Sequence, residues 1–112
     1  MRILKGKTGE DKAAAFLKKK GCAIIARNYR AKTGEIDIIA EQGGVLVFVE
    51  VKTRDTSTYG EGFESVTGIK QAKIIRTAEF YITQNNVEKL CRFDVISIDG
   101  DKITHIENAF GA

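Results

Sequence analysis

Two strand-like segments joined by a pair of glycines constrain this chain more than any other feature of its sequence. Residues 35–41 and 45–53 are rich in Ile, Val and Phe, and the glycines at 43–44 between them are typical of a hairpin turn. A two-residue turn at these glycines places Asp37 opposite Glu50, and a turn centred one residue earlier places the two diagonally. Side chains alternate with period two, so both registers put both carboxylates on one face of a sheet.

These two carboxylates need a positive partner, because like charges about 5 Å apart across two strands destabilise a sheet. Lys52 follows Glu50 by two residues and therefore projects from the same face. Asp, Glu and Lys on one face suit metal-dependent phosphodiester hydrolysis, in which hard oxygen ligands hold Mg²⁺ and the lysine positions a water or offsets negative charge. The alternative is a structural Asp–Lys–Glu ion-pair network on a half-solvated hairpin, since structural ion pairs form the same clusters.

An ordered set of motifs gives the chain a resemblance that runs nearly end to end. The set consists of GKTGEDKAAAFLKKKG, RNYR, GEIDIIA, FVEVKTR, RFDVISI and a late AF. It resembles the YraN family of small bacterial proteins, which is similar to the restriction-endonuclease-like PD-(D/E)XK nucleases, including archaeal Holliday-junction resolvases. One position departs from that superfamily, because Ile36 stands where a proline often precedes the Asp.

This resemblance implies an α/β fold with a restriction-endonuclease-like α-β-β-β-α-β core, a mixed sheet flanked by helices, in a single nuclease-like domain over residues 1–112. The cofactor it implies is Mg²⁺ or Mn²⁺. The metal ligands it implies are Glu10, Asp37, Glu50 and the Val51 carbonyl. The catalytic residues it implies are Lys52, Asp37, Glu50 and Lys70. Such enzymes often form homodimers to cut two strands, but no sequence feature here indicates an interface.

A first helix is expected from Gly9 to Lys20, with Thr8 as its N-cap and Gly21 as its stop. Glu10 then lies in the first turn and has two interpretations. Its carboxylate either compensates the helix dipole or leans over the core-facing side of the helix toward the hairpin. The family resemblance favours the second interpretation, a role in the site.

A second helix is expected over residues 67–84, followed by strands at 93–99 and 103–107. A crossover from 45–53 through this helix to 93–99 makes those two strands parallel in a mixed sheet. The helix residues expected to face the core are Ile69, Ala72, Ile75, Ala78 and Ile82.

Basic residues flank the predicted site, where they either form a solvated face or hold phosphates beside the carboxylates. Related nucleases place a basic or amide side chain of the second helix near the scissile phosphate, and Lys70 and Gln71 match that position. Tyr29 either stacks on a base or packs against the sheet. A glycine- and hydroxyl-rich segment, residues 55–65, is expected to be a mobile loop beside the site. The candidate nucleic-acid ligands are Arg27, Arg30, Lys32, Arg54, Lys70 and Gln71.

A formal charge of +3, from 18 basic and 15 acidic residues, permits nucleic-acid binding without demanding it. No apolar run is long enough for a signal peptide or a membrane span, so we expect a cytoplasmic protein without a membrane partner. Cys22 and Cys91 lack zinc-motif spacing and are expected to be reduced thiols. A lone histidine, His105, argues against histidine-based catalysis, and Asp94 is expected to pair with Arg92 or a lysine.

Three functions follow from these observations. The first is a Mg²⁺- or Mn²⁺-dependent endonuclease acting on DNA, with branched DNA among its substrates. An alternative is a non-catalytic module that binds nucleic acid or a protein on the same fold, although a pure binder has no need for convergent carboxylates. The third is an interaction protein whose acidic face binds a basic partner. Salt dependence separates them, because phosphate binding weakens steeply with salt.

Overall fold

The fold is a mixed sheet with a helix on each side, seen in a computed structural model that describes residues 5–54 and 67–111. Its strands lie in the order β1-β2-β3-β4-β5, with β3 and β4 parallel and the other neighbours antiparallel. This arrangement contains the predicted α-β-β-β-α-β core, including the parallel pair. The elements in chain order are α1 (Lys5–Lys19), β1 (Ala23–Ala31), β2 (Gly34–Gln42), β3 (Val45–Arg54), α2 (Gly68–Gln84), β4 (Leu90–Asp99) and β5 (Lys102–Phe110).

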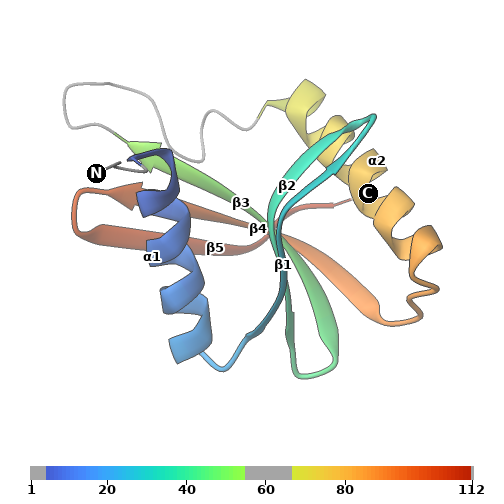
Figure 1. The fold of residues 1–112 in the computed structure, drawn as a ribbon, viewed down its shortest axis with the longest axis horizontal. Helices are drawn as coiled ribbons and strands as arrows, with labels where there is room; N and C mark the ends of the chain where they lie inside the picture. The colour runs from blue at the N-terminus through green and yellow to red at the C-terminus, as the bar shows by residue number, and fades with distance from the viewer. Residues whose placement is uncertain (1–4, 55–66, 112) are drawn as a thin grey trace.

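Apolar burial holds the two helices on opposite faces of the sheet (Figure 1). Leu17 of α1 packs with Val49 and other aliphatic side chains on one face. On the other face, Ile74 of α2 packs with Phe48. Each such side chain, when fully buried, contributes roughly 1.5–3 kcal/mol. Within the described ranges neither helix is long and apolar enough to cross a membrane.

The start of α1 differs from the sequence-based prediction. The helix begins at Lys5 rather than at Gly9, so Thr8 lies inside it and is not its N-cap. Gly9 lies inside the helix and against β3, where a Cβ at this position would collide with the Thr53 hydroxyl. Glu10 therefore lies in the second turn, and compensation of the dipole by a first-turn carboxylate no longer accounts for it.

Gly21 ends α1 as predicted. Its φ of 93° is open to glycine at little cost. The Cys22 N–H donates to the Leu17 carbonyl at 3.0 Å, and the Gly21 N–H donates to the Lys18 carbonyl at 3.0 Å. These two bonds form a Schellman motif, which satisfies carbonyl groups that the helix end would otherwise leave without partners.

The β2–β3 hairpin has the predicted register. Gln42 pairs with Val45, and Ile38 pairs with Val49. The two turn glycines have φ values of 57° and 81°. Positive φ at both central residues defines the type I′ turn, whose twist matches that of the flanking strands. The register of the central hairpin was therefore readable from the sequence.

The core-facing side of α2 matches the predicted stripe at Ile75, Ala78 and Ile82 and departs from it at Ile69. Its buried residues are Ile74, Thr77 and Ala78, whereas Ile69, predicted to be in the core, is 74% exposed. Five residues separate Ile69 from Ile74, which rotates them by about 140° around the helix. The helix start agrees with the prediction, because the Thr67 hydroxyl caps it by accepting the Lys70 N–H at 3.3 Å.

Asp94 is the centre of a buried polar cluster on the α1 side of the sheet. Its carboxylate accepts from Arg92 Nε at 3.0 Å, from His105 Nε2 at 2.7 Å and from the Asn108 N–H at 3.0 Å. The Lys20 ammonium can only donate, so the 2.9 Å contact with His105 Nδ1 puts the imidazole proton on Nε2. The predicted pairing of Asp94 with Arg92 is confirmed, and the cluster joins β5 to β4.

Replacing the central carboxylate tests this cluster. Asp94→Asn removes the negative charge that Arg92 and His105 share, and breaking a buried pair costs about 3–5 kcal/mol. We expect the free energy of unfolding in urea to fall by about 3 kcal/mol. Asp101→Asn, in the exposed turn after β4, is the matched control and should change it by less than about 0.5 kcal/mol. Equal stabilities of the two variants would contradict the structural role.

Candidate active site at the fork between β2 and β3

The central hairpin opens into a fork at its far end. Pairing between β2 and β3 runs from the turn to Ile38 and Val49. Beyond this point β2 stays paired with β1 as far as Gly34, and β3 stays paired with β4 as far as Arg54. In Figure 1 the β1–β2 hairpin and β3 diverge, and the first residues drawn of α1 and α2 lie at the same end of the molecule. The fork leaves room for side chains between two strands of one sheet.

Asp37 lies where the strands separate and where the alternation of side chains breaks. Ile38 packs on the α1 face, but Ile36 packs on the α2 face, although two residues apart should share a face. In β1, the strand paired with this part of β2, the alternation of side chains also breaks around Asn28, whose φ is 56°. A strong local twist thus places Asp37 at the border of both faces, where regular alternation would have assigned it to one.

The Asp37 carboxylate takes the place of a backbone partner. Its Oδ2 accepts the Val51 N–H at 2.7 Å, just beyond the last β2–β3 pair. The pKa of Asp37 is raised to about 7, first by burial and then by the Glu50 charge, while the hydrogen bond from the Val51 N–H opposes the shift. The Glu10 charge adds to the rise. The predicted convergence of acidic side chains is therefore present in the electrostatics of the fork.

Glu50 is the second acidic group of the fork, and lysines surround it. Its pKa is raised by burial, against the opposing charges of Lys52 and Lys70 and a hydrogen bond with the Asp37 carboxyl. The Lys52 ammonium lies 3.4 Å from Glu50 Oε2. A pocket of about 160 Å³ opens here, lined by Gly34, Glu35, Glu50, Lys52, Lys70, Lys73 and Ile74. The structure thus brings Lys70 of α2 to the site that β3 carries.

Two half-buried carboxylates with raised pKa values fit a hard divalent cation, because a cation nearby would favour their charged forms. Asp37, Glu50 and the Val51 carbonyl are the oxygen ligands available. In the described part of the chain, however, no three His, Cys, Asp or Glu side chains are grouped closely enough to hold a metal ion. Glu10 is near enough to raise the pKa of Asp37 but does not complete such a group.

Glu10 instead pairs with a predicted phosphate ligand. Arg27 Nη2 lies 3.5 Å from Glu10 Oε1 and 2.7 Å from Asp11 Oδ1. Both carboxylates belong to α1, and the guanidinium that bridges them belongs to β1. Arg27 thus joins the helix to the sheet beside the fork, and sequence reasoning missed Asp11 as its main partner.

The remaining predicted ligands lie around the fork. Arg30 is 78% exposed, and its Nε lies 3.5 Å from Glu35 Oε2. Lys32 is exposed, and Gln71 is half-buried on α2. Arg54 ends β3, but its side chain and the predicted loop at 55–65 lie outside what the structure describes.

Two residues of the RNYR motif have structural roles. The Tyr29 ring packs edge-on against Tyr81 of α2, with centroids 5.1 Å apart, so the packing interpretation is confirmed. Asn28 adopts the left-handed conformation that lets the strand change face. Asparagine tolerates this conformation better than most residues, and that preference was the available signal for a break in the strand.

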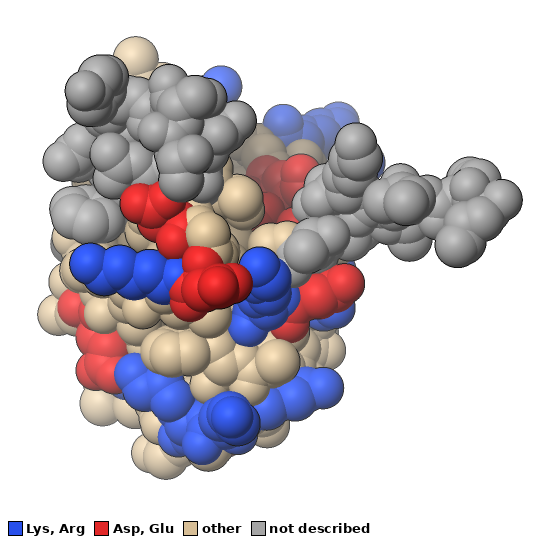
Figure 2. Space-filling view, turned by 90° about the vertical axis from the view of Figure 1, so that its left-hand side faces the viewer, with Lys and Arg blue, Asp and Glu red and all other residues tan. Residues whose placement is uncertain are grey.

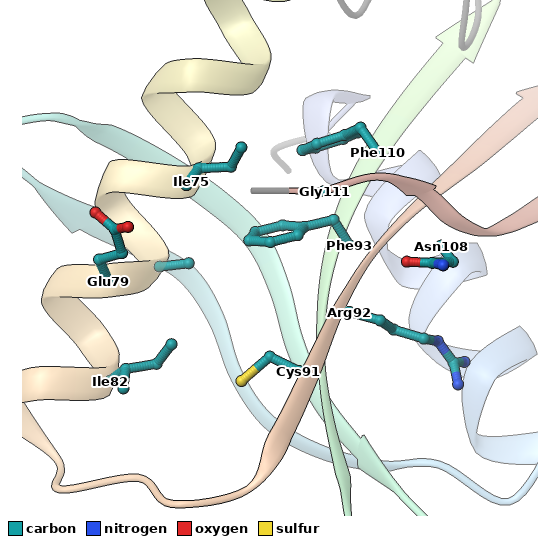
Figure 3. Close-up of a pocket in the computed structure, with 10 residues that line it drawn as sticks. Ile75, Glu79, Ile82, Cys91, Arg92, Phe93, Asn108, Phe110 and Gly111 are labelled. Carbon is teal, nitrogen blue, oxygen red and sulfur yellow. The ribbon is translucent and has the colours of Figure 1, made fainter.

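A larger and mostly apolar hollow of about 290 Å³ lies elsewhere, between α2 and the strands β4 and β5. Figure 3 shows Ile75 and Ile82 of α2 across from Phe93 and Phe110, while the Arg92 side chain points away from them. The Phe93 and Phe110 rings stack with centroids 5.1 Å apart. Glu50, whose pKa is raised, lines the smaller pocket at the fork and is absent from the lining of this hollow, so the fork is the better candidate site.

The pKa of Asp37 predicts a pH-dependent stability. A carboxyl group whose pKa rises from its usual value of about 4 to about 7 on folding favours the folded state at low pH, and loses that contribution as the pH rises through 7. In the presence of a chelator, Asp37→Asn should therefore be more stable than the wild type at pH 8, by on the order of 2 kcal/mol, and similar at pH 4. Urea denaturation across this range measures the difference, with Asp101→Asn as control. A constant difference across the range would contradict the shifted pKa.

Comparison with known proteins places this chain in a family. The model of the Uncharacterised protein family UPF0102 matches residues 9–98. A UPF0102 protein of Sulfurihydrogenibium sp. (strain YO3AOP1) is 51% identical, covering 95% of this chain and 93% of the relative. UPF0102 proteins of Persephonella marina and Symbiobacterium thermophilum are 48% and 49% identical, each covering 96% of this chain and 93% and 96% of the relative. The chain therefore belongs to family UPF0102, the YraN family that its motifs resemble.

Proposed function

We propose that this protein is a Mg²⁺- or Mn²⁺-dependent endonuclease that hydrolyses phosphodiester bonds in DNA, including branched DNA. The observation that carries the proposal is the interaction of Asp37 with Glu50, two half-buried carboxylates with raised pKa values, beside the Lys52 ammonium. Holding two such groups together weakens the metal-free protein, and a divalent cation would relieve that repulsion. Perturbed pKa values of this kind concentrate at functional sites.

The roles of the ligands follow from their positions at the fork. Asp37 and Glu50, with the Val51 carbonyl, would hold the cation, which when bound polarises the phosphoryl group and lowers the pKa of an attacking water. The Val51 N–H bond to Asp37 Oδ2 fixes the orientation of that carboxylate. It leaves the other carboxylate oxygen for the metal.

Lys52 is the residue that would assist the chemical step. Its ammonium lies 3.4 Å from Glu50 Oε2, and its side chain also lines the fork pocket. From there it can orient a water or offset the negative charge that develops on the phosphate. Lys70 of α2 lines the same pocket. Its ammonium would contact the scissile phosphate, as the basic side chain of this helix is expected to do.

Nucleic acid would reach the fork across the β1–β2 hairpin and the start of α2. Arg30, Lys32, Lys70 and Lys73 are exposed there, and Arg54 and Gln71 are the other proposed contacts. A second basic region lies elsewhere: Figure 2 shows basic side chains gathered low on the α1 face, and the last turn of α1 carries Lys18 and Lys19. The fork is preferred because it also holds the carboxylates.

A non-catalytic binding module is the second candidate function. The 3.4 Å contact between Lys52 and Glu50 favours it, because this ion pair partly satisfies the carboxylate without a metal. The grouping of two rather than three potential ligands among the described residues points the same way. Metal binding and cleavage separate the two functions.

Calorimetry with Mn²⁺ and a cleavage assay on linear, single-stranded and branched DNA test the enzyme. We expect the wild type to bind Mn²⁺ and to cleave, and the Asp37→Ala, Glu50→Ala double variant to do neither. Lys52→Met should bind Mn²⁺ and lose about 100-fold or more in cleavage rate. Glu41→Gln, on β2 and paired with Lys89, is the control and should match the wild type. If the wild type does not bind Mn²⁺, the nuclease proposal is wrong.

Salt dependence tests the nucleic-acid surface. If Lys32 and Lys70 each neutralise one phosphate, replacing either with Ala should reduce the slope of log K against log salt by about 0.9 for duplex DNA. Lys18→Ala, at the far end of α1, should leave the slope unchanged. Filter binding or fluorescence anisotropy at salt concentrations from about 50 to 200 mM measures these slopes. Equal slopes for all proteins would place the phosphate contacts elsewhere.

A further inference from the structure

Arg27 is shared unequally between two neighbouring carboxylates of α1. Its Nη2 is 2.7 Å from Asp11 Oδ1, a distance typical of a charge-assisted hydrogen bond, and 3.5 Å from Glu10 Oε1. The hydrogen bond to Asp11 is also the main reason why the pKa of Arg27 is raised. Arg27 is therefore held mainly by Asp11, and Glu10 is its weaker partner.

Glu10 lies between Arg27 and the fork. Its side chain is 14% exposed, so its carboxylate has little contact with water. The same carboxylate is close enough to Asp37 to raise the pKa of that group. Among the described residues, Glu10 forms one ion pair, the long contact with Arg27. A mostly buried carboxylate with one long ion pair and two acidic neighbours would gain from a closer cation.

The loss of Glu10 as a partner would cost Arg27 little. If the Glu10 carboxylate rotates away, the guanidinium keeps its shorter bond to Asp11 and remains neutralised. Gly9 holds this part of α1 against β3, because a Cβ there would collide with Thr53. The backbone of α1 next to Glu10 is therefore close to β3, the strand that carries Glu50.

We infer that Arg27 competes with a divalent cation for Glu10, so that Glu10 exchanges Arg27 for the metal when the fork is loaded. Arg27 is then a positioning residue that sets the metal affinity of the site, and Asp11 sets how firmly Arg27 holds Glu10. This inference rests on the proposed function, since it concerns the same metal site. It assigns Arg27 to the carboxylates of α1, where the sequence had suggested a phosphate ligand.

Mn²⁺ calorimetry on full-length variants tests the competition. Arg27→Lys keeps the positive charge but has a single ammonium in place of the two-sided guanidinium, so it should stay with Asp11 and release Glu10. We expect Arg27→Lys and Arg27→Gln to bind Mn²⁺ about 3- to 10-fold more tightly than the wild type. Asp11→Asn should bind it more weakly, because Arg27 then holds Glu10 as its remaining carboxylate. Arg76→Gln, which removes an exposed arginine of α2, controls for the loss of a positive charge and should bind Mn²⁺ as the wild type does.

A double-mutant cycle separates competition from a general effect on the fold. In a Glu10→Gln background, the Arg27 and Asp11 substitutions should no longer change the Mn²⁺ affinity. If Arg27→Lys and Arg27→Gln bind Mn²⁺ as the wild type does, or more weakly, or if their gain persists in the Glu10→Gln background, the competition is disproved and the nuclease proposal stands. If the wild type binds no Mn²⁺, both are overturned.

Discussion

The structure of the fork depends on one hydrogen bond, from the Val51 N–H to the Asp37 carboxylate. In a continuous hairpin this N–H would join the ladder between the strands, and β2 and β3 would stay together. An acidic side chain as its acceptor lets the strands part without leaving a buried donor unpaired, which would cost about 1–3 kcal/mol. The same bond orients the carboxylate, so one interaction both lets the strands separate and positions a side chain of the site.

The charges around the fork are balanced by elements distant in sequence. Desolvation disfavours the charged forms of Asp37 and Glu50, and the Glu50 charge adds to this for Asp37, while Lys52 and Lys70 oppose it for Glu50. On the other side Arg27 restrains Glu10. Burial and proximity together thus make the acidic groups costly in the metal-free protein, and cations from β1, β3 and α2 limit that cost. A site of this kind is suited to bind a further cation.

The hairpin shows how much of the site could be predicted from residues that are close together in the sequence. The paired glycines set a type I′ turn, and this turn fixes the register by which Asp37 and Glu50 meet. Lys52 follows at the spacing that puts it beside Glu50. The parallel crossover through α2 also followed from the order of segments. These features depend on residues close together in the chain, where turn chemistry and period-two alternation are strong constraints.

Other features were decided only by tertiary packing. The position of Asp37 at the border of both faces required the twist at Asn28, and the close approach of α1 to β3 required a glycine at position 9, against Thr53. Which carboxylates Arg27 would join could not be read from β1 alone, because its partners lie on a helix whose position is set by the core. The sequence by itself determined which chemical groups meet on the central hairpin. Tertiary structure decided how α1 and α2 complete the site, because contacts between distant segments have no local signal in the chain.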